Sequence, residues 1–422
     1  MSWLLTGTVG HAAARQAIAK IVCRHTVLHS HLAARGGRIV QISDEFPGTS
    51  LEIIDVRDLR PRDRWRAVAA WTAQALREPR TLTAGTLFER RLWRLGGKHW
   101  VLALVAAHSV WDAGSTEVFI REFIRVHDAW AHGEAGQPVG RPLHLPAHAD
   151  PQRAEGDVFD LWRQRLARER RRSAFPELLA IANRRPFQMA SAPIPPLSPA
   201  LRQRLADVAH ECAVSSAASA MAGVALLLDL FAGPHPKMIG VAYANRDRPE
   251  HRELLGCLVE IVPVVVDVSE SATLRDVVRA AGRALQDFRR AGVTMGALFP
   301  ESAAEGPWRG EATCEVLLNY MAAGDASFHH AGETLDARFC GYSSHQPKPI
   351  PFMWEFALFD FTLRGARDGG LEGDLNYNTA AVEREYVHRL SLAFARILRT
   401  IALHPDQGVR GLLHCLATSE RA

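Results

Sequence analysis

Residues 101–115, VLALVAAHSVWDAGS, place an apolar run directly before a histidine. Seven apolar residues lead to His108, and Asp112 follows four residues later, before an Ala-Gly-Ser sequence. A continuous apolar run of this length is typical of a buried strand, and the residues after it are typical of a tight turn into a helix. The stretch therefore predicts an imidazole that is held on rigid scaffold at the edge of a core.

The rest of the chain alternates between helical and strand patterns. We expect helices at residues 12–29, 65–76, 117–130, 201–212, 216–231, 274–290 and 382–403. We expect strands at residues 3–6, 38–42, 88–95, 99–106, 238–243, 257–268, 316–320, 356–363 and 371–377. Residues 133–151 and 193–199 are rich in Pro, which predicts loops. Because single cores stop growing beyond about 250–300 residues, this α/β pattern predicts an N-terminal lobe over residues 1–175 and a C-terminal lobe over residues 176–422.

Composition argues against several classes of protein. A formal net charge of +4 over 422 residues is too small to indicate a nucleic-acid partner. The six Cys residues form no C-x-x-C pair, which argues against a zinc ribbon or a disulfide framework and fits a reducing cytoplasm. The start, MSWLLTG, lacks the basic region of a signal peptide, and the longest apolar run, residues 217–228, is too short to span a bilayer and predicts a buried helix. We therefore expect a cytoplasmic protein.

His108 and Asp112 can be interpreted in two ways. Their spacing alone is weak evidence, because His329 and Glu333 show it as well. A histidine that is bonded within a core, or that caps the next helix, is the usual alternative. A neutral imidazole on a rigid strand end can instead accept a proton from an attacking amine or hydroxyl. In that interpretation Asp112 orients the turn through a buried Arg and does not touch the substrate.

The sequence AAHSVWDAGS resembles the HHxxxDG motif of condensation domains of nonribosomal peptide synthetases. The HxxxD core of that motif is shared with chloramphenicol acetyltransferase and plant BAHD acyltransferases. The resemblance runs nearly from end to end of the chain, and its further segments are residues 4–32, 239–268, 316–321, 356–363 and 371–383.

The resemblance implies an α/β fold of two chloramphenicol-acetyltransferase-like lobes, arranged as a V with a tunnel between them. In this resemblance His108 matches the catalytic His, Asp112 a structural Asp, and Arg246 the Arg that pairs with it. The remaining residues that the resemblance places at the site are Ala113 and Gly114 at the motif, and Ser115, Asn319, Asp360 and Glu260 along the tunnel. We expect Asp112 and Arg246 to form a buried, hydrogen-bonded pair.

Three residues depart from the family pattern. Ala107 replaces the first His of the motif, Ala113 replaces its Gly, and Glu260 stands where the family often has Asn. Because Gly is chosen where backbone and ligand come close, a Cβ on Ala113 is expected to narrow the channel or to shift the turn.

The N-terminus is a fourth departure. The family normally has a further strand and helix before the segment that residues 4–32 match. If those elements belong to the fold, we expect an unpaired strand edge and an exposed apolar patch beside residues 3–6.

Three functions are compatible with these residues. The first is a condensation-type acyltransferase, which moves an acyl or peptidyl group from a carrier-protein thioester to an amine or hydroxyl acceptor. The second is an acyl-CoA-dependent O- or N-acyltransferase. The third is a catalytically inactive platform that recruits tailoring enzymes, which Ala107 and Ala113 together favour. The resemblance implies no metal or organic cofactor, only substrates carried on phosphopantetheine, and its implied partners are acyl or peptidyl carrier proteins and a small-molecule acceptor, with no nucleic acid and no membrane.

Overall fold

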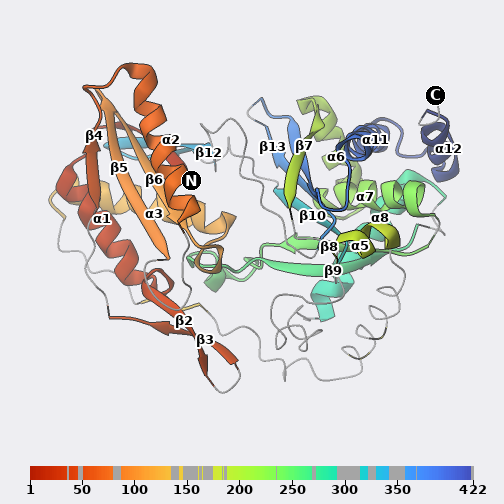
Figure 1. Ribbon diagram of the computed structural model, residues 1–422, viewed down its shortest axis with the longest axis horizontal. Coiled ribbons are helices and arrows are strands. Elements are labelled where there is room, and N and C mark those ends of the chain that lie inside the picture. Colours follow the sequence, from red (N-terminus) through yellow and green to blue (C-terminus); the bar gives the residue numbers. More distant parts are fainter. Residues whose placement is uncertain are drawn as a thin grey trace. The chain divides into compact units, whose positions relative to one another are not determined.

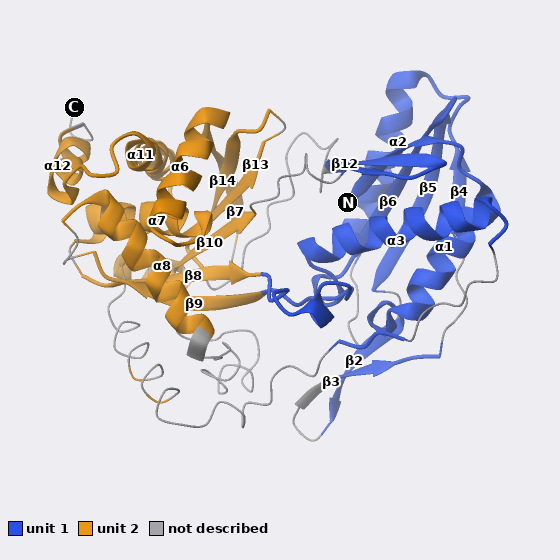
Figure 2. Cartoon of the chain, turned by 180° about the vertical axis from the view of Figure 1, so that it is seen from behind, with its two compact units in different colours: residues 1–147, 244–259, 325–350 blue, residues 148–243, 260–324, 351–422 orange. Residues whose placement is uncertain are grey.

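The computed structural model describes residues 1–35, 38–45, 51–78, 87–134, 142–145, 160, 164, 174–182, 184, 188–233, 235–268, 272–291, 314–321, 329–341, 357–366 and 368–419. These residues form two compact units, each built around a six-stranded sheet with helices (Figures 1 and 2). Unit 1 comprises residues 1–147, 244–259 and 325–350, and unit 2 comprises residues 148–243, 260–324 and 351–422.

The units do not divide the chain at one point. The sequence predicted a continuous N-terminal lobe over residues 1–175, but two segments from the second half of the chain, 244–259 and 325–350, belong to unit 1. The second of these segments supplies two strands to the sheet of unit 1, and the first is bound by a helix of unit 1. Long-range strand pairing of this kind leaves no local pattern in a sequence.

The sheet of unit 1 has the strand order β11-β12-β1-β6-β5-β4. Its strands are β1 (Ser2–Gly7), β4 (Glu52–Asp55), β5 (Phe88–Gly96), β6 (His99–Ala106), β11 (His329–Ala331) and β12 (Leu335–Gly341). β5 and β6 form the hairpin that the Gly96-Gly97 turn predicts, and Gly97 has a φ of +53° that a glycine adopts without strain. Strands β2 (Ser30–Arg35) and β3 (Arg38–Ser43) form a separate hairpin.

Helices pack on both faces of this sheet. The helices α1 (His11–Arg24) and α3 (Ala113–Ala131) share one apolar core with β1 and β6. Helix α2 (Pro61–Arg77) packs on the opposite face, against the alternate side chains of β5 and β6. The alternation of side chains along β6 thus places consecutive residues in two different cores, which explains why this strand is apolar throughout.

The first strand has no unpaired edge. β1 pairs antiparallel with β12 on one side and with β6 on the other, and the side chains of Trp3 and Leu5 are fully buried. The expectation of an open strand edge beside residues 3–6 is therefore wrong, because β12, more than 300 residues later in the sequence, covers that edge.

The sheet of unit 2 has the strand order β7-β14-β13-β10-β8-β9. Its strands are β7 (Met189–Leu197), β8 (Lys237–Tyr243), β9 (Glu260–Val266), β10 (Val316–Met321), β13 (Phe359–Gly365) and β14 (Leu371–Asn378). The described helices of this unit are α5 (Pro176–Ala182), α6 (Pro199–Glu211), α7 (Ser216–Ala232), α8 (Leu274–Ala291), α11 (Arg384–Leu403) and α12 (Val409–Ser419). Their apolar side chains form the main core with one face of the sheet.

Helix α7 is the central helix of unit 2. Its residues from Ala218 to Leu228 are buried, as the apolar run at 217–228 predicts. Gly223 lies against α11, where a Cβ would fall 2.7 Å from Leu398 Cδ2 and 3.0 Å from Phe394 Cε2. Among the described helices, no single one is long and apolar enough to cross a membrane. The helices α6 and α7 would reach that length and hydropathy only together, and the chain bends by 98° between them.

The expected loop at residues 193–199 is wrong for most of its length. Residues 193–197 belong to β7, which pairs with β14 at the edge of the sheet. An edge strand tolerates Pro because the outer side of the strand needs no N–H donors. The other expected loop, residues 133–151, lies largely outside the described residues.

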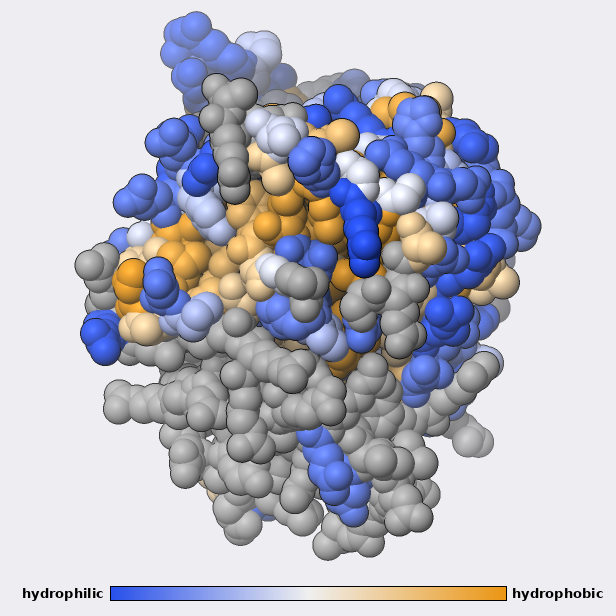
Figure 3. Space-filling view, turned by 90° about the vertical axis from the view of Figure 1, so that its right-hand side faces the viewer, coloured by the Kyte–Doolittle hydropathy of each residue, from blue (hydrophilic) through white to orange (hydrophobic). Residues whose placement is uncertain are grey.

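Figure 3 shows one face of the molecule, on which apolar residues gather near the middle and hydrophilic residues lie above them and to their right. Two of the exposed large apolar side chains of the described chain, Leu392 and Leu403, lie on α11 of unit 2.

Candidate functional site

His108 lies just beyond the end of β6. The strand is buried from Trp100 to Val105 and ends at Ala106, and His108 begins a short 3₁₀ turn that runs to Val110. The Ala107 N–H donates to the Leu87 carbonyl oxygen at 2.8 Å, which continues the pairing of the hairpin up to the residue before His108. The side chain of His108 is exposed, so a rigid backbone presents an accessible imidazole.

Asp112 caps the helix that follows. Its side chain accepts a hydrogen bond from the Ser115 N–H at 2.8 Å, and the Ser115 hydroxyl lies 3.4 Å from the Asp112 N–H, so the two residues form a capping box at the start of α3. A cap of this type satisfies amide groups that the first turn of a helix leaves unpaired. The four-residue spacing of His108 and Asp112 therefore arises because a short 3₁₀ turn begins at His108 and the cap of α3 follows it directly.

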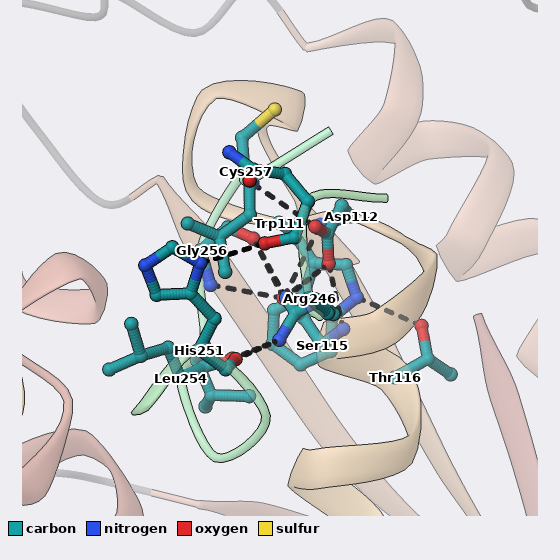
Figure 4. A network of polar contacts seen from close by, with 12 residues as sticks. Trp111, Asp112, Ser115, Thr116, Arg246, His251, Leu254, Gly256 and Cys257 are labelled. Atoms are coloured by element: carbon teal, nitrogen blue, oxygen red, sulfur yellow. Dashed lines mark hydrogen bonds and ion pairs between the residues drawn. The ribbon is translucent and has the colours of Figure 1, made fainter. Parts of the chain in front are cut away.

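Asp112, which is buried, and Arg246, which is largely buried, form the hydrogen-bonded pair that the resemblance implies. Arg246 Nη2 lies 2.7 Å from Asp112 Oδ1, and the side chains are 13% and 4% exposed (Figure 4). Arg246 Nη1 also donates to the carbonyl oxygens of His251 at 3.0 Å and Leu254 at 2.8 Å. Both partners belong to unit 1, because residues 244–259 return to that unit.

The helix cap also holds the segment after Arg246. The Gly256 N–H donates to Ser115 Oγ at 3.0 Å, and the Leu258 N–H donates to Asp112 Oδ2 at 3.1 Å. Gly256 has a φ of +145°, and a Cβ there would fall 2.4 Å from Leu145 Cδ2, so only glycine fits. Ser115, which was predicted to line a tunnel, is fully buried and serves this backbone network.

The two small residues after Asp112 have different surroundings. Ala113 is the first residue of α3 and is exposed. Gly114 lies against Arg246, and a Cβ on it would fall 2.2 Å from Arg246 Nε. The glycine that close packing requires in this turn is therefore Gly114, one residue later than in the family motif.

Cys257 is a residue of this site that the sequence analysis missed. Its Sγ lies 3.4 Å from His108 Nδ1, and it is half-buried. The signal that could have found it is its position within residues 239–268, one of the segments that carry the resemblance.

The predicted site residues of unit 2 lie on its sheet. Asn319 is half-buried on β10, and Asp360 is buried on the neighbouring β13, where Thr362 Oγ1 donates to Asp360 Oδ1 at 3.3 Å. The strand register aligns Asn319 with Thr362, so Asn319 and Asp360 share one face of the sheet. Burial raises the pKa of Asp360 to about 7.

Glu260 lies elsewhere on the same sheet. It is the first residue of β9 and pairs with Tyr243, whose side chain packs against the helix-covered core. Alternation along the strands therefore places Glu260 on the face opposite Asn319 and Asp360. Burial raises the pKa of Glu260. The roles of these three residues at a substrate tunnel, and the V-shaped arrangement of the lobes, stay predictions.

The similarity of this sequence to one known family extends over nearly the whole chain. The family model described as "Condensation domain" matches residues 1–421. A linear gramicidin synthase polypeptide of Brevibacillus parabrevis is 24% identical over 440 residues, which cover 99% of this chain and 5% of that protein. Phosphinothricin tripeptide synthetase PhsC of Streptomyces viridochromogenes is 25% identical over 409 residues, which cover 93% of this chain and 36% of that protein. The chain thus spans only a small part of the length of these relatives.

Solved crystal structures share the fold of this chain. The SgcC5 protein of Streptomyces globisporus superposes with a TM-score of 0.70 at 17% identity, covering 96% of this chain and 92% of that chain. The X-domain from teicoplanin biosynthesis also superposes with a TM-score of 0.70, at 19% identity, covering 97% of this chain and 91% of that chain. The mixed α/β architecture is therefore the chloramphenicol-acetyltransferase-like fold of condensation domains, as the motifs predicted, and the chain belongs to the condensation-domain family.

Proposed function

We propose that this domain is a condensation-type acyltransferase of nonribosomal peptide biosynthesis or a related pathway of secondary metabolism. It would transfer an acyl or peptidyl group from a phosphopantetheine thioester on a carrier protein to an amine or hydroxyl acceptor. The observation that carries the proposal is the exposed imidazole of His108, which stands at the end of a buried strand beside the anchored Asp112–Arg246 turn.

The chemistry needs a group that removes one proton. An amine or hydroxyl attacks the thioester carbonyl carbon, a C–N or C–O bond forms, and the C–S bond to the pantetheine arm breaks. His108 would accept the proton from the attacking group and deliver it to the departing thiolate, a role worth roughly 10²–10⁴ in rate. Asp112 would not contact the substrate, because both of its oxygens are occupied by Arg246, Ser115 and the Leu258 N–H. It would instead hold the turn that follows His108.

The donor class can be tested directly. The experiment incubates the protein with acyl groups loaded on a carrier protein, or on CoA, together with a panel of amine and hydroxyl acceptors. Intact-mass analysis then follows loss of the acyl group from the carrier and gain on the acceptor. Transfer from the carrier supports the proposal, transfer from CoA alone indicates an acyl-CoA-dependent acyltransferase, and no transfer from either donor contradicts acyl transfer.

A second candidate function is a recruitment platform without catalysis. Ala107 in place of the first motif His favours this function. The fold is also similar to that of the X-domain from teicoplanin biosynthesis, and that X-domain has been solved in complex with OxyB. The accessible imidazole of His108 favours the enzymatic proposal, because a platform does not require it. Binding of a tailoring enzyme without acyl transfer would establish the second function instead.

A further inference from the structure

A buried histidine of unit 1, His25, binds the segment that lies beside His108. His25 directly follows helix α1, and its side chain is 1% exposed. The Leu255 N–H donates to His25 Nδ1 at 3.4 Å. Two residues after Leu255 comes Cys257, whose Sγ lies 3.4 Å from His108 Nδ1. We propose, on the basis of the acyl transfer proposed above, that His25 is a positioning residue that holds this segment, and through it His108, in the geometry that transfer requires.

The hydrogen bonds of His25 determine which ring nitrogen carries the proton. A backbone N–H can only donate, so Nδ1, which faces the Leu255 N–H, is the nitrogen without a proton. The proton is therefore on Nε2, which donates to Glu122 Oε2 at 3.0 Å. Both ring nitrogens are used, so the imidazole cannot turn without losing either its bond to the segment or its bond to α3.

Glu122 keeps the imidazole of His25 in place. It is 6% exposed on α3, and Arg24 binds its Oε1 while His25 binds its Oε2. A carboxylate that is bound at both oxygens has one orientation, which fixes the ring that it holds. The support of His25 thus comes from α3, the same helix that Asp112 caps.

The segment over residues 251–258 is bound at three places. Arg246 binds the carbonyl oxygens of residues 251 and 254, and the cap of α3 binds the N–H groups of residues 256 and 258 (Figure 4). His25 provides the bond between these two sets of contacts, at Leu255, which is 1% exposed. Because a buried N–H without a partner is unfavourable, loss of the imidazole should make the backbone at Leu255 move.

Movement of this backbone would reach His108 through Cys257. An exposed side chain such as that of His108 has several rotamers, and a neighbour within hydrogen-bond distance favours one of them. A displacement of about 1 Å in a reacting group can lower a rate about a hundredfold. His25 would thus act on acyl transfer through the backbone, without contacting donor or acceptor.

Two substitutions separate the two bonds of His25. The side-chain oxygen of Asn lies near the position of Nδ1 and can accept from the Leu255 N–H, whereas the amide of Gln lies near the position of Nε2 and can donate to Glu122. At saturating carrier-bound donor, His25→Gln should slow single-turnover transfer at least about tenfold, and His25→Asn less than about threefold. The donor concentration that gives half of the maximal rate should be unchanged in both variants, because His25 is buried.

The matched control is His127→Gln. His127 is also 1% exposed in unit 1 and also accepts a backbone N–H, but its partners are Gly10, Asp128 and Thr334. This variant should lower the melting temperature as His25→Gln does and leave the saturating rate of transfer unchanged. An equal loss of rate in His25→Gln and His127→Gln, or in His25→Gln and His25→Asn, would assign the effect to stability and overturn the positioning role.

Hydrogen exchange tests the bond to Leu255 without any acyl donor. Mass spectrometry follows deuterium uptake in the peptide that spans residues 251–258. His25→Gln should speed exchange in this peptide at least about tenfold, whereas His25→Asn and His127→Gln should exchange like the parent. Uptake in His25→Gln that equals that of the parent would overturn the inference, whatever the activity of the protein.

Glu122 offers a second pair of variants if His25→Gln does not fold. Glu122→Gln keeps an oxygen for the Nε2–H of His25, and Glu122→Ala removes it. Only Glu122→Ala should speed exchange in the 251–258 peptide and slow transfer. Equal behaviour of the two variants would contradict the support of His25 by this side chain.

The results separate this inference from the proposed function. If no donor gives product with the parent protein, the proposed function fails, and the role of His25 in transfer fails with it. If the parent transfers the acyl group and His25→Gln transfers it equally fast, only the inference is overturned. Transfer that is slowed in His25→Gln but not in His25→Asn or His127→Gln, together with faster exchange over residues 251–258, would establish His25 as a positioning residue.

Discussion

Gly114 lies so close to Arg246 that a Cβ on the glycine would fall 2.2 Å from Arg246 Nε and 2.6 Å from its Cδ. Gly114→Ala should therefore force Arg246 away from Asp112. Overpacking of this kind costs about 1–3 kcal/mol, and the loss of the buried ion pair would add to it. We expect a clear drop in the free energy of unfolding, measured in urea.

The matched control is the neighbouring residue. Ala113 is exposed at the first position of α3, and Ala113→Gly should change stability by less than about 1 kcal/mol. The same variant restores the glycine of the family motif without removing a reactive group, so acyl transfer should be preserved or raised. Equal destabilisation in the two variants would show that the close contact between Gly114 and Arg246 is not what lowers the stability of Gly114→Ala.

Asp112→Ala should be among the most destabilising substitutions in unit 1. It leaves Arg246 buried without its carboxylate and removes the cap of α3. Removal of one partner from a buried pair costs about 3–5 kcal/mol. The control is Asp63→Ala, which breaks ion pairs to the exposed side chains of Arg60 and Arg66 and should cost less than about 1 kcal/mol. Thermal melts of the two variants that coincide would contradict a buried role for Asp112.

Asp360 should make unit 2 less stable as the pH rises. Burial raises its pKa to about 7, above the value of about 3.9 that an unfolded chain gives. The stability that the protonated carboxyl contributes is therefore fully present below about pH 4 and is lost as the pH rises to about 7. The side chain of Asp360→Asn cannot ionise and still offers an oxygen to Thr362. At pH 8 the free energy of unfolding of this variant should therefore exceed that of the parent by up to about 4 kcal/mol, whereas at pH 4 the two should differ little.

Its control is Asp336→Asn, because Asp336 is an exposed aspartate on β12. The stability difference between this variant and the parent should be the same at both pH values. A difference for Asp360→Asn that does not depend on pH would show that Asp360 is ionised in the folded protein.

His127 should make the protein less stable in acid. Its side chain is 1% exposed, its Nε2 accepts a hydrogen bond from the Gly10 N–H at 3.2 Å, and burial lowers its pKa. Because the folded state disfavours the imidazolium, stability should fall as the pH drops below about 6.5, the ordinary value of the unfolded chain. His127→Gln should flatten this dependence in a series of urea titrations between pH 5 and 8. An unchanged slope would assign the acid sensitivity to other groups.

The sequence predicted what local patterns determine. The hairpin of β5 and β6, the helix after Asp112 and the buried helix α7 follow from apolar periodicity and turn glycines. The pairing of Asp112 with Arg246 followed from family resemblance, because no rule of spacing connects residues 134 positions apart.

Other features depend on contacts that no local pattern records. The pairing of β1 with β12 and the return of residues 244–259 to unit 1 are both long-range. β7 was missed because its prolines suppress a strand prediction, although an edge strand accepts them. The proximity of Cys257 to His108 was invisible for the same reason as the strand pairing, since it depends on where a distant segment is bound.

The role of His108 in removing the proton during acyl transfer is tested most directly by single-turnover product formation with a matched carrier-bound donor. His108→Ala should fold normally and slow transfer at least about a hundredfold. His99→Ala, at the exposed opposite end of the same strand β6, should leave the rate unchanged. Transfer by His108→Ala at the parent rate would contradict the role of His108 as the base.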